Sequence, residues 1–215
     1  MRILAVANVS RWDAAQAAAT ERLLPPADLA RSRRYRRWQD GQATLLGRLL
    51  LRLALIRHGF DPALLGAVTV DAADRPSLPA PLEFNISHTE GLVALITSRN
   101  GPVGIDVEYL RPLDPADLGT ALTADDRRRI AAAGDPVAAM LHCWTAKEAV
   151  VKAAGLGITV PELPLWRDGT MTCDGRTWWT ATWTWPSHIL TAAHGRPFVP
   201  PVIETVGLDA LLAQI

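Results

Sequence analysis

Residues 104–109 read Gly-Ile-Asp-Val-Glu-Tyr and alternate between apolar and acidic side chains. A period of two predicts a β-strand whose successive side chains point to opposite faces of a sheet. The apolar members then share one face, and Asp106 and Glu108 share the other, with Cα atoms roughly 6.6 Å apart. On an exposed sheet face water solvates such carboxylates. On a covered face they need cations, because burying an unpaired charge is costly.

A third acidic residue lies in a segment with helical periodicity. Residues 136–154 predict a helix that ends at Gly155, a residue type that commonly follows a helix end. Helical spacing aligns four side chains on one stripe: Leu141, Trp144, Glu148 and Lys152. Taken alone, this stripe is also typical of a salt-bridged helix surface. Together with Asp106 and Glu108, Glu148 completes a set of oxygen donors that suits Mg²⁺, which often shares its coordination with substrate phosphates.

Another motif, at residues 84–89, reads Phe-Asn-Ile-Ser-His-Thr and predicts a strand. Phe84 and Ile86 take the inward positions, and a turn leads into a second strand at residues 92–96. His88 lies at the end of the first strand. A histidine in such a place is usually a satisfied polar group, but its ring can also point into a cleft and donate a hydrogen bond to a phosphate.

The three motifs, in this order, resemble those of the 4′-phosphopantetheinyl transferases of the surfactin-synthetase-activating type. The resemblance rests on residues 84–89, 104–108 and 144–152, and weaker similarity extends to residues 44–47 and 192–194. It implies an enzyme that transfers the 4′-phosphopantetheine arm of coenzyme A to a serine of an acyl or peptidyl carrier protein. Mg²⁺ would be the cofactor, and 3′,5′-adenosine diphosphate would be released.

The same resemblance implies roles for individual residues. The implied metal ligands are Asp106, Glu108 and Glu148. The implied catalytic groups are Glu148, Lys152 and His88. The implied coenzyme A ligands are Arg31, Thr44, Arg75, Ser87, His88 and Lys152. Glu148 is our preferred general base, because its position near a large aromatic residue predicts a poorly hydrated carboxylate. Whether it acts as base, ligand or both stays open at this point.

Five arginines gather in residues 31–37, a density that suits phosphate or nucleic acid but equally a solvated helix face. The resemblance implies that this region binds the 3′-phosphate of coenzyme A. Arg31 and Arg75 stand where the family has lysines, and a guanidinium preserves phosphate binding. Ala43 departs from the family, because it replaces a basic residue that contacts the nucleotide. Arg48 lies on a different helical stripe and is a doubtful replacement.

Each half of the chain pairs one long apolar helix with several strands. The first helix is predicted at residues 39–57 and ends before Gly59, and the second is the helix at 136–154. We therefore expect an α+β protein. The resemblance adds two similar α/β halves related by a pseudo-twofold axis: residues 1–102 on the nucleotide side of coenzyme A, and residues 103–215 with the metal site, the carrier-protein side and the C-terminal strand and helix.

Local signals predict the shorter elements. A polar loop at residues 110–117 precedes a small helix that Thr123 caps, with Asp126 at its third position. Two runs rich in Trp and Thr predict an antiparallel hairpin that turns near Pro186. These two runs are residues 176–185 and 187–193. Further strands are predicted at residues 1–9 and 202–206. Leucines at 208, 211 and 212 follow the last strand and can cover apolar surface.

Composition bounds the class of protein without identifying it. The 215 residues include 22 basic and 22 acidic side chains, so no global field attracts nucleic acid or a membrane. No apolar run reaches the roughly 20 residues that span a bilayer. The two cysteines have no metal or redox spacing. We expect a cytoplasmic protein and, since both walls of one coenzyme A site lie in one chain, a monomer that meets its carrier protein transiently.

Two functions of other classes use the same features. A Mg²⁺-dependent nucleotide or coenzyme A hydrolase needs the three carboxylates but uses water as the nucleophile. An RNA-binding module rests on the arginines of residues 31–37 and on the eight tryptophans. A packed sheet face explains the tryptophans better, because the chain carries no net positive charge.

Overall fold

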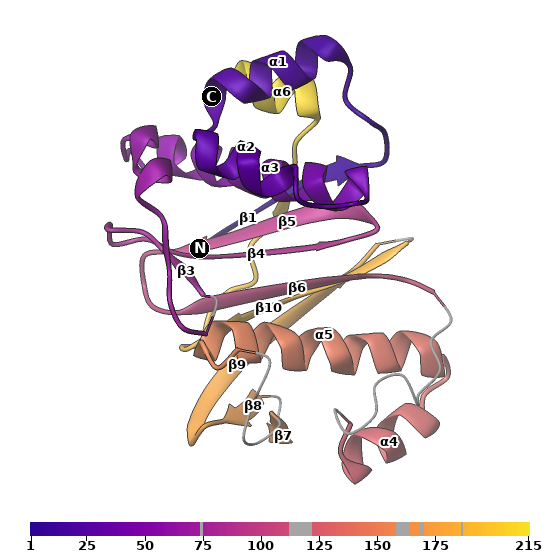
Figure 1. Cartoon of the computed structure of the whole chain (residues 1–215). Coiled ribbons are helices and arrows are strands. Elements are labelled where there is room, and N and C mark those ends of the chain that lie inside the picture. The colour runs from indigo at the N-terminus through magenta and orange to yellow at the C-terminus, as the bar shows by residue number, and fades with distance from the viewer. Residues whose placement is uncertain (74, 112–121, 158–163, 168–169, 186) are drawn as a thin grey trace. The chain divides into compact units, whose positions relative to one another are not determined.

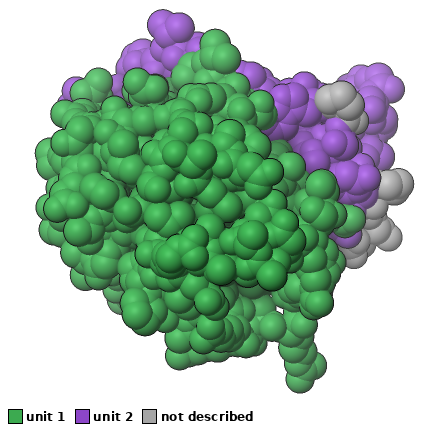
Figure 2. All heavy atoms as spheres, turned by 90° about the horizontal axis from the view of Figure 1, so that it is seen from above, with its two compact units in different colours: residues 1–100, 201–215 green, residues 101–200 purple. Residues whose placement is uncertain are grey.

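The computed structural model describes residues 1–73, 75–111, 122–157, 164–167, 170–185 and 187–215. The chain forms two compact units, shown in different colours in Figure 2. Unit 1 contains residues 1–100 and 201–215, and unit 2 contains residues 101–200. Each unit has a sheet and one long helix of its own (Figure 1), and each is described by itself below.

Unit 1 is built on a four-stranded sheet with the order β11-β1-β5-β4. Its strands are β1 (Arg2–Asn8), β4 (Glu83–Thr89), β5 (Gly91–Ser98) and β11 (Ile203–Thr205). β5 pairs antiparallel with both β1 and β4, whereas β11 runs parallel to β1. β2 (Thr69–Val70) and β3 (Pro76–Ser77) form a separate two-stranded ribbon.

The long helix α3 (Trp38–Arg57) covers one face of this sheet. Leu46, Leu50 and Leu53 of α3 belong to the same buried core as Leu4, Phe84 and Leu95 of the strands. Burial of such side chains contributes roughly 1.5–3 kcal/mol each. The smaller helices of unit 1 are α1 (Ala14–Leu23), α2 (Pro26–Ser32), the 3₁₀ turn η1 (Pro62–Ala67) and α6 (Leu208–Ala213).

Unit 2 has a five-stranded antiparallel sheet with the order β6-β10-β9-β8-β7, so β6 is an edge strand. Its strands are β6 (Val103–Tyr109), β7 (Leu165–Arg167), β8 (Thr170–Cys173), β9 (Arg176–Thr184) and β10 (His188–His194). Helix α5 (Pro136–Ala154) lies along β6 and β10 (Figure 1), and α4 (Ala124–Ala131) packs against α5.

Most of the predicted elements form where the sequence placed them. α5 has the predicted bounds, and Gly155 ends it in the left-handed conformation with φ of 71°. Thr123 and Asp126 form the predicted capping box of α4. The motif strands and the hairpin of β9 and β10 are also confirmed. Most of the polar loop predicted at 110–117, and Pro186 of the hairpin turn, lie outside the described residues.

The C-terminal segment corrects the expected division of the chain. Its strand and helix form as predicted, but they belong to unit 1 and not to the second half. β11 adds to the edge of β1, with Ile3 opposite Ile203, and Leu211 enters the core of unit 1. Edge pairing and apolar burial together hold this segment on unit 1. The α+β class is confirmed, while the pseudo-twofold relation stays a prediction.

Among the helices that the structure describes, none combines the length and the apolar composition needed to cross a lipid bilayer.

Candidate active site

Helix α5 lies unusually close to strand β6 at Gly104. A Cβ atom on Gly104 would lie 2.0 Å from the carbonyl oxygen of Ala149 and 2.6 Å from the backbone nitrogen of Ala153. Atoms do not approach so closely without bonding, so only glycine permits this packing. Asp106 and Glu108 follow Gly104 on the same face of β6, so the close packing brings their side chains near α5.

Asp106 and Glu108 both contact α5. Asp106, only 5% exposed, accepts a bond from Lys152, with Nζ and Oδ1 2.5 Å apart. Trp144 donates its indole N–H to Glu108, with Nε1 and Oε1 3.3 Å apart. The two carboxylates thus share one strand face, as the alternation predicted, and the predicted helix stripe supplies Trp144 and Lys152 to them. The face is covered, and a cation balances the buried Asp106.

Glu148 lies between Trp144 and Lys152 on the same helix stripe and is half-buried. Burial raises the pKa of its carboxyl, the Lys152 ammonium opposes that shift, and the carboxylates of Asp106 and Glu108 raise the pKa further. Glu148 therefore holds a proton more firmly than an exposed glutamate does. The charges of Asp106 and Glu108 also affect the pKa of Glu148, so the three acidic groups interact electrostatically as one cluster.

No group of three or more His, Cys, Asp or Glu side chains in the described parts of the chain is arranged to hold a metal ion. Asp106 faces the Lys152 ammonium, and Glu108 accepts from Trp144. The chemistry of the donor set nevertheless fits Mg²⁺, because three carboxylates offer hard oxygen ligands and crowd one another electrostatically. The Lys152 ammonium balances the charge of Asp106, which a bound metal ion would also balance.

Threonines fix α5 to the sheet behind this cluster. The hydroxyl groups of Thr145 on α5 and Thr191 on β10 lie 2.8 Å apart, and that of Thr191 lies 2.9 Å from the hydroxyl of Thr182 on β9. Thr191 is also the register partner of Asp106. Because Thr145 and Thr191 are fully buried, their hydrogen bonds fix the position of α5 relative to the strand that carries Asp106.

Lys147, the residue before Glu148, contacts α4 and the residue that precedes β7. It is 2% exposed, forms an ion pair with Asp126 of α4 at 2.8 Å, and donates to the carbonyl oxygen of Pro164 at 2.9 Å. One buried ammonium thus joins α4, α5 and the start of β7. A role for Lys147 was not predicted from the sequence, although its position among small and apolar residues on the buried side of α5 was a signal for one.

Replacement of Lys147 by methionine is expected to lower the free energy of unfolding by about 3–5 kcal/mol, because it strands the buried Asp126 carboxylate. Burial raises the pKa of Asp126, but hydrogen bonds from Lys147 and Thr123 outweigh burial and lower it overall. A lowered pKa stabilises the fold above the ordinary value of 3.8, and this contribution is lost as the pH falls below that value.

Urea denaturation at pH 7 and at acidic pH measures both effects. In the double variant Lys147→Met/Asp126→Asn the second substitution should recover part of the loss, whereas Arg22→Met, at an exposed site, should change stability by at most about 0.5 kcal/mol. A cost for Lys147→Met below 1 kcal/mol would contradict this account.

Five of the six predicted coenzyme A ligands lie in unit 1, and the sixth, Lys152, lies on α5 in unit 2. Arg31 is exposed and lines a shallow hollow of about 470 Å³ with Ala27, Arg34 and Tyr35. Arg75 pairs with Glu83 at 2.6 Å. The hydroxyl of Thr44 donates to the carbonyl oxygen of Asp40. Ser87 is buried on β4, whereas His88, next to it, is exposed. Within unit 1, Arg31 is the predicted ligand with an open surface beside other basic groups.

The departure at Ala43 has a structural reason. Ala43 is 2% exposed and belongs to the core of unit 1, so a basic side chain there would have to be buried. Arg48 does not replace it, because its guanidinium pairs with Asp28 at 2.8 Å and donates to the carbonyl oxygen of Leu65 at 2.7 Å. Neither position 43 nor position 48 of α3 therefore offers an unpaired cation to a phosphate.

Comparison with known proteins finds a family match over the segment that contains the β6–α5 cluster. Residues 102–184 match the family model described as the 4′-phosphopantetheinyl transferase superfamily. This segment contains Asp106, Glu108, Glu148 and Lys152. This segment of the chain is similar to the 4′-phosphopantetheinyl transferases.

Individual 4′-phosphopantetheinyl transferases also align with this chain, two of them over a longer stretch. One from Bacillus subtilis is 31% identical over 135 residues, which cover 60% of this chain and 59% of the relative. A second, named gsp, from Aneurinibacillus migulanus, is 30% identical and covers 65% and 59%. AcpT from Salmonella typhimurium is 40% identical over 83 residues, 37% of this chain and 43% of AcpT. The chain thus spans about three fifths of the length of the first two.

Proposed function

We propose that this chain transfers the 4′-phosphopantetheine arm of coenzyme A to a serine of an acyl or peptidyl carrier protein, in the manner of the surfactin-synthetase-activating type. The observation that carries the proposal is the cluster on β6 and α5. Three carboxylates and one lysine gather there, within the segment that matches the transferase superfamily. Such a cluster suits chemistry at a pyrophosphate, where charge must be neutralised and a proton accepted.

In the proposed reaction the serine hydroxyl attacks the β-phosphorus of coenzyme A. A bond forms between the serine oxygen and phosphorus, the pyrophosphate P–O bond breaks, and 3′,5′-adenosine diphosphate leaves with the bonding electrons. Glu148 accepts the serine proton. Its raised pKa suits this role, because a base is most effective when its pKa lies nearer to the working pH than that of an exposed carboxylate.

Asp106, Glu108 and Glu148 would hold Mg²⁺, which when bound neutralises charge on the pyrophosphate. Lys152 would then turn from Asp106 to the phosphates. The side chain is long and 28% exposed, so it has both the reach and the access for this change. Its ammonium would stabilise the negative charge that develops on the leaving group.

Unit 1 supplies the other proposed coenzyme A ligands. Arg31, with the neighbouring Arg34, would bind the 3′-phosphate at the open hollow beside Tyr35. Arg75 and His88 would contribute further donors, as would the hydroxyl groups of Thr44 and Ser87. We also propose that the protein acts in the cytoplasm, as a monomer, and that it binds no nucleic acid. Light scattering of the purified protein tests whether it is a monomer.

Mass spectrometry of carrier proteins tests the proposed reaction. The protein is mixed with coenzyme A, Mg²⁺ and apo carrier proteins from fatty-acid, polyketide and peptide synthesis. We expect at least one carrier to gain a single phosphopantetheine on its serine, and a carrier with serine replaced by alanine to gain none. Cleavage of coenzyme A at an equal rate without a carrier would instead indicate a hydrolase.

Glu148→Gln is expected to lower kcat by about a hundredfold or more, because it keeps the shape of the side chain but cannot accept a proton. The binding constant of coenzyme A, measured by calorimetry, should change much less. Transfer is followed at several Mg²⁺ concentrations. Full recovery of kcat at high Mg²⁺ would show that Glu148 acts only as a metal ligand and that another group is the base.

A further inference from the structure

The buried ion pair of Lys147 and Asp126 involves the residue that directly precedes the proposed general base, yet no step of the proposed chemistry uses it. Lys147 is 2% exposed and Asp126 is 3% exposed. The ammonium contacts the Asp126 carboxylate at 2.8 Å and donates to the carbonyl oxygen of Pro164 at 2.9 Å. Lys147 belongs to α5, and its two acceptors belong to α4 and to the residue before β7.

Asp126 is itself held in place by the start of α4. The backbone N–H and the hydroxyl group of Thr123 donate to its Oδ2 atom at 2.8 Å and 2.7 Å, and this atom also contacts Lys147. Burial alone would raise the pKa of the Asp126 carboxyl, but these donors outweigh burial and lower it overall. Asp126 is therefore ionised at neutral pH. It gives the ammonium a fixed partner that neither charge could lose cheaply in a buried site.

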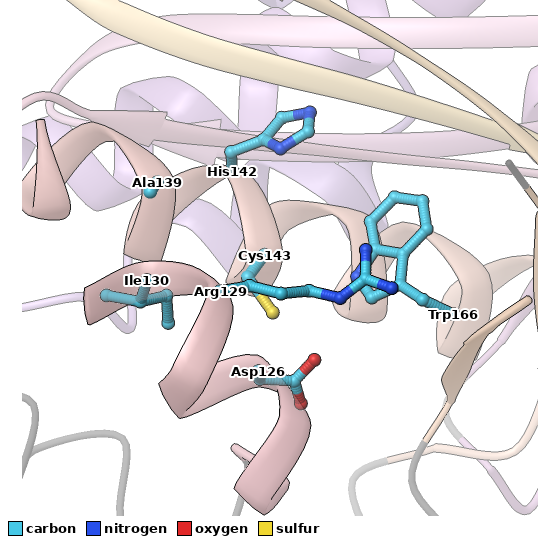
Figure 3. A pocket seen from close by; sticks show the side chains of 7 residues that line it. All are labelled: Asp126, Arg129, Ile130, Ala139, His142, Cys143 and Trp166. Carbon is cyan, nitrogen blue, oxygen red and sulfur yellow. The ribbon is translucent and has the colours of Figure 1, made fainter. Parts of the chain in front are cut away.

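Among the described residues, a hollow of about 360 Å³ interrupts the packing of α4 on α5 and β7. Its lining residues are Asp126, Arg129, Ile130, Ala139, His142, Cys143 and Trp166 (Figure 3). Beside it, Ile130 packs against the small apolar cluster that contains Cys143. Apolar contacts are not directional, so next to a hollow they permit one helix to turn against the other. The ion pair is directional and restricts that rotation.

The direction of the Lys147 side chain determines that of Glu148. Consecutive side chains on an α-helix are about 100° apart around the axis and about 1.5 Å apart along it. A helix that keeps Lys147 on Asp126 and Pro164 therefore keeps Glu148 in one orientation. The contact between Thr145 and Thr191 fixes α5 to the sheet two residues before Lys147, whereas the ion pair fixes α5 to α4. Glu148 directly follows both fixed points.

We propose that the ion pair of Asp126 and Lys147 positions Glu148, so that Asp126 is a positioning residue that acts on the reaction only through Lys147. Without the carboxylate, the ammonium keeps only the carbonyl oxygen of Pro164, which is a costly state for a buried charge. The side chain then moves toward water and displaces the helix around residues 147 and 148. A base displaced by about 1 Å loses much of its effect on the rate. The proposal rests on the proposed transferase function, in which Glu148 is the base.

Asp126→Asn tests the positioning role, because it keeps the shape of the side chain and an acceptor for Thr123 but removes the charge. In protein shown to be folded by circular dichroism, kcat for transfer should fall about tenfold or more, while KM for coenzyme A stays within about twofold. Asp126→Glu restores the negative charge and should recover most of kcat. A loss of folded protein alone would change neither kcat per folded molecule nor its recovery by glutamate.

Two further variants separate positioning from stability. Ile130→Ala is the matched control on α4, because it removes apolar contact beside the same hollow and leaves the ion pair. It should lower the urea midpoint while kcat stays within about twofold. The double variant Asp126→Asn/Lys147→Met removes both charges, so it should be more stable than Asp126→Asn but equally slow. If Asp126→Asn does not fold, kcat of the double variant decides.

Normal kcat of folded Asp126→Asn, an equal loss of kcat in Ile130→Ala, or full recovery of kcat in the double variant would overturn the positioning role while transfer by the unaltered protein continued. Failure of the unaltered protein to modify any carrier would instead remove the proposed function, and this role of Asp126 with it.

Discussion

Asp106→Ala is expected to reduce phosphopantetheine transfer by about a thousandfold or more, because it removes a proposed metal ligand and the carboxylate that positions Lys152. The fold should survive the change. Asp106 is buried and pairs with Lys152, whose side chain is partly exposed, so the ammonium can turn to water when this carboxylate is lost. Relief of repulsion on Glu148 offsets part of the lost ion pair.

Three measurements on purified Asp106→Ala examine this expectation: transfer by mass spectrometry, Mn²⁺ binding by calorimetry, and unfolding by urea. Loss of both transfer and Mn²⁺ binding, with a folded protein, agrees with the metal assignment. Glu21→Ala removes an equal charge from an exposed position on α1 and should keep full activity. Activity of Asp106→Ala within tenfold of the unaltered protein at saturating Mg²⁺ would show that Asp106 is not a metal ligand.

Periodicity was a good guide to the largest elements. The apolar face of α3 and the uninterrupted apolar run of α5 marked both long helices, and glycine marked the end of each. Helix α1 was missed, since its sequence is mostly small and polar and only one of its residues is buried. Its capping box, formed by Asp13 and Gln16, was the local signal that could have found it.

Strand partners were harder to predict than strands. The last strand was correctly placed in the sequence, but its partner, β1, lies about two hundred residues away in the chain. Alternation fixes which side chains share a face and says nothing about which edge a strand joins. The division into halves therefore differs from the two units at residues 201–215, where pairing decides the unit, and by two residues at the boundary, which lies after Asn100 and not after Pro102.

For the candidate site, too, features of a single element could be predicted from the sequence, whereas contacts between elements could not. The sequence predicted that Asp106 and Glu108 share a face and that Trp144 and Lys152 share a helix stripe, because both statements follow from the period of one element. It did not predict that Lys152 pairs with Asp106, which depends on how α5 lies on β6. Tertiary packing buries Ala43 and pairs Arg48 with Asp28, which agrees with the expectation that Arg48 does not replace the missing basic residue.

Gly104 controls that packing, and its replacement should have the second large effect. Gly104→Ala places a methyl group 2.0 Å from the carbonyl oxygen of Ala149, a backbone atom that cannot turn aside. Either β6 or α5 must move by more than about 1 Å to restore ordinary contact distances. Asp106 and Glu108 follow on the strand, and Glu148 is next to Ala149, so the movement separates the acidic groups from their helix partners.

We therefore expect Gly104→Ala to lower transfer at least a hundredfold, the usual consequence of displacing catalytic groups by about 1 Å. Strain should also reduce the free energy of unfolding by about 1–3 kcal/mol. Gly134→Ala is the matched control, because its Cβ would meet no atom within 4 Å. Transfer assays on protein shown to be folded by circular dichroism separate the two effects. If folded Gly104→Ala keeps normal activity and normal Mn²⁺ binding, then close packing of α5 on β6 does not position the site.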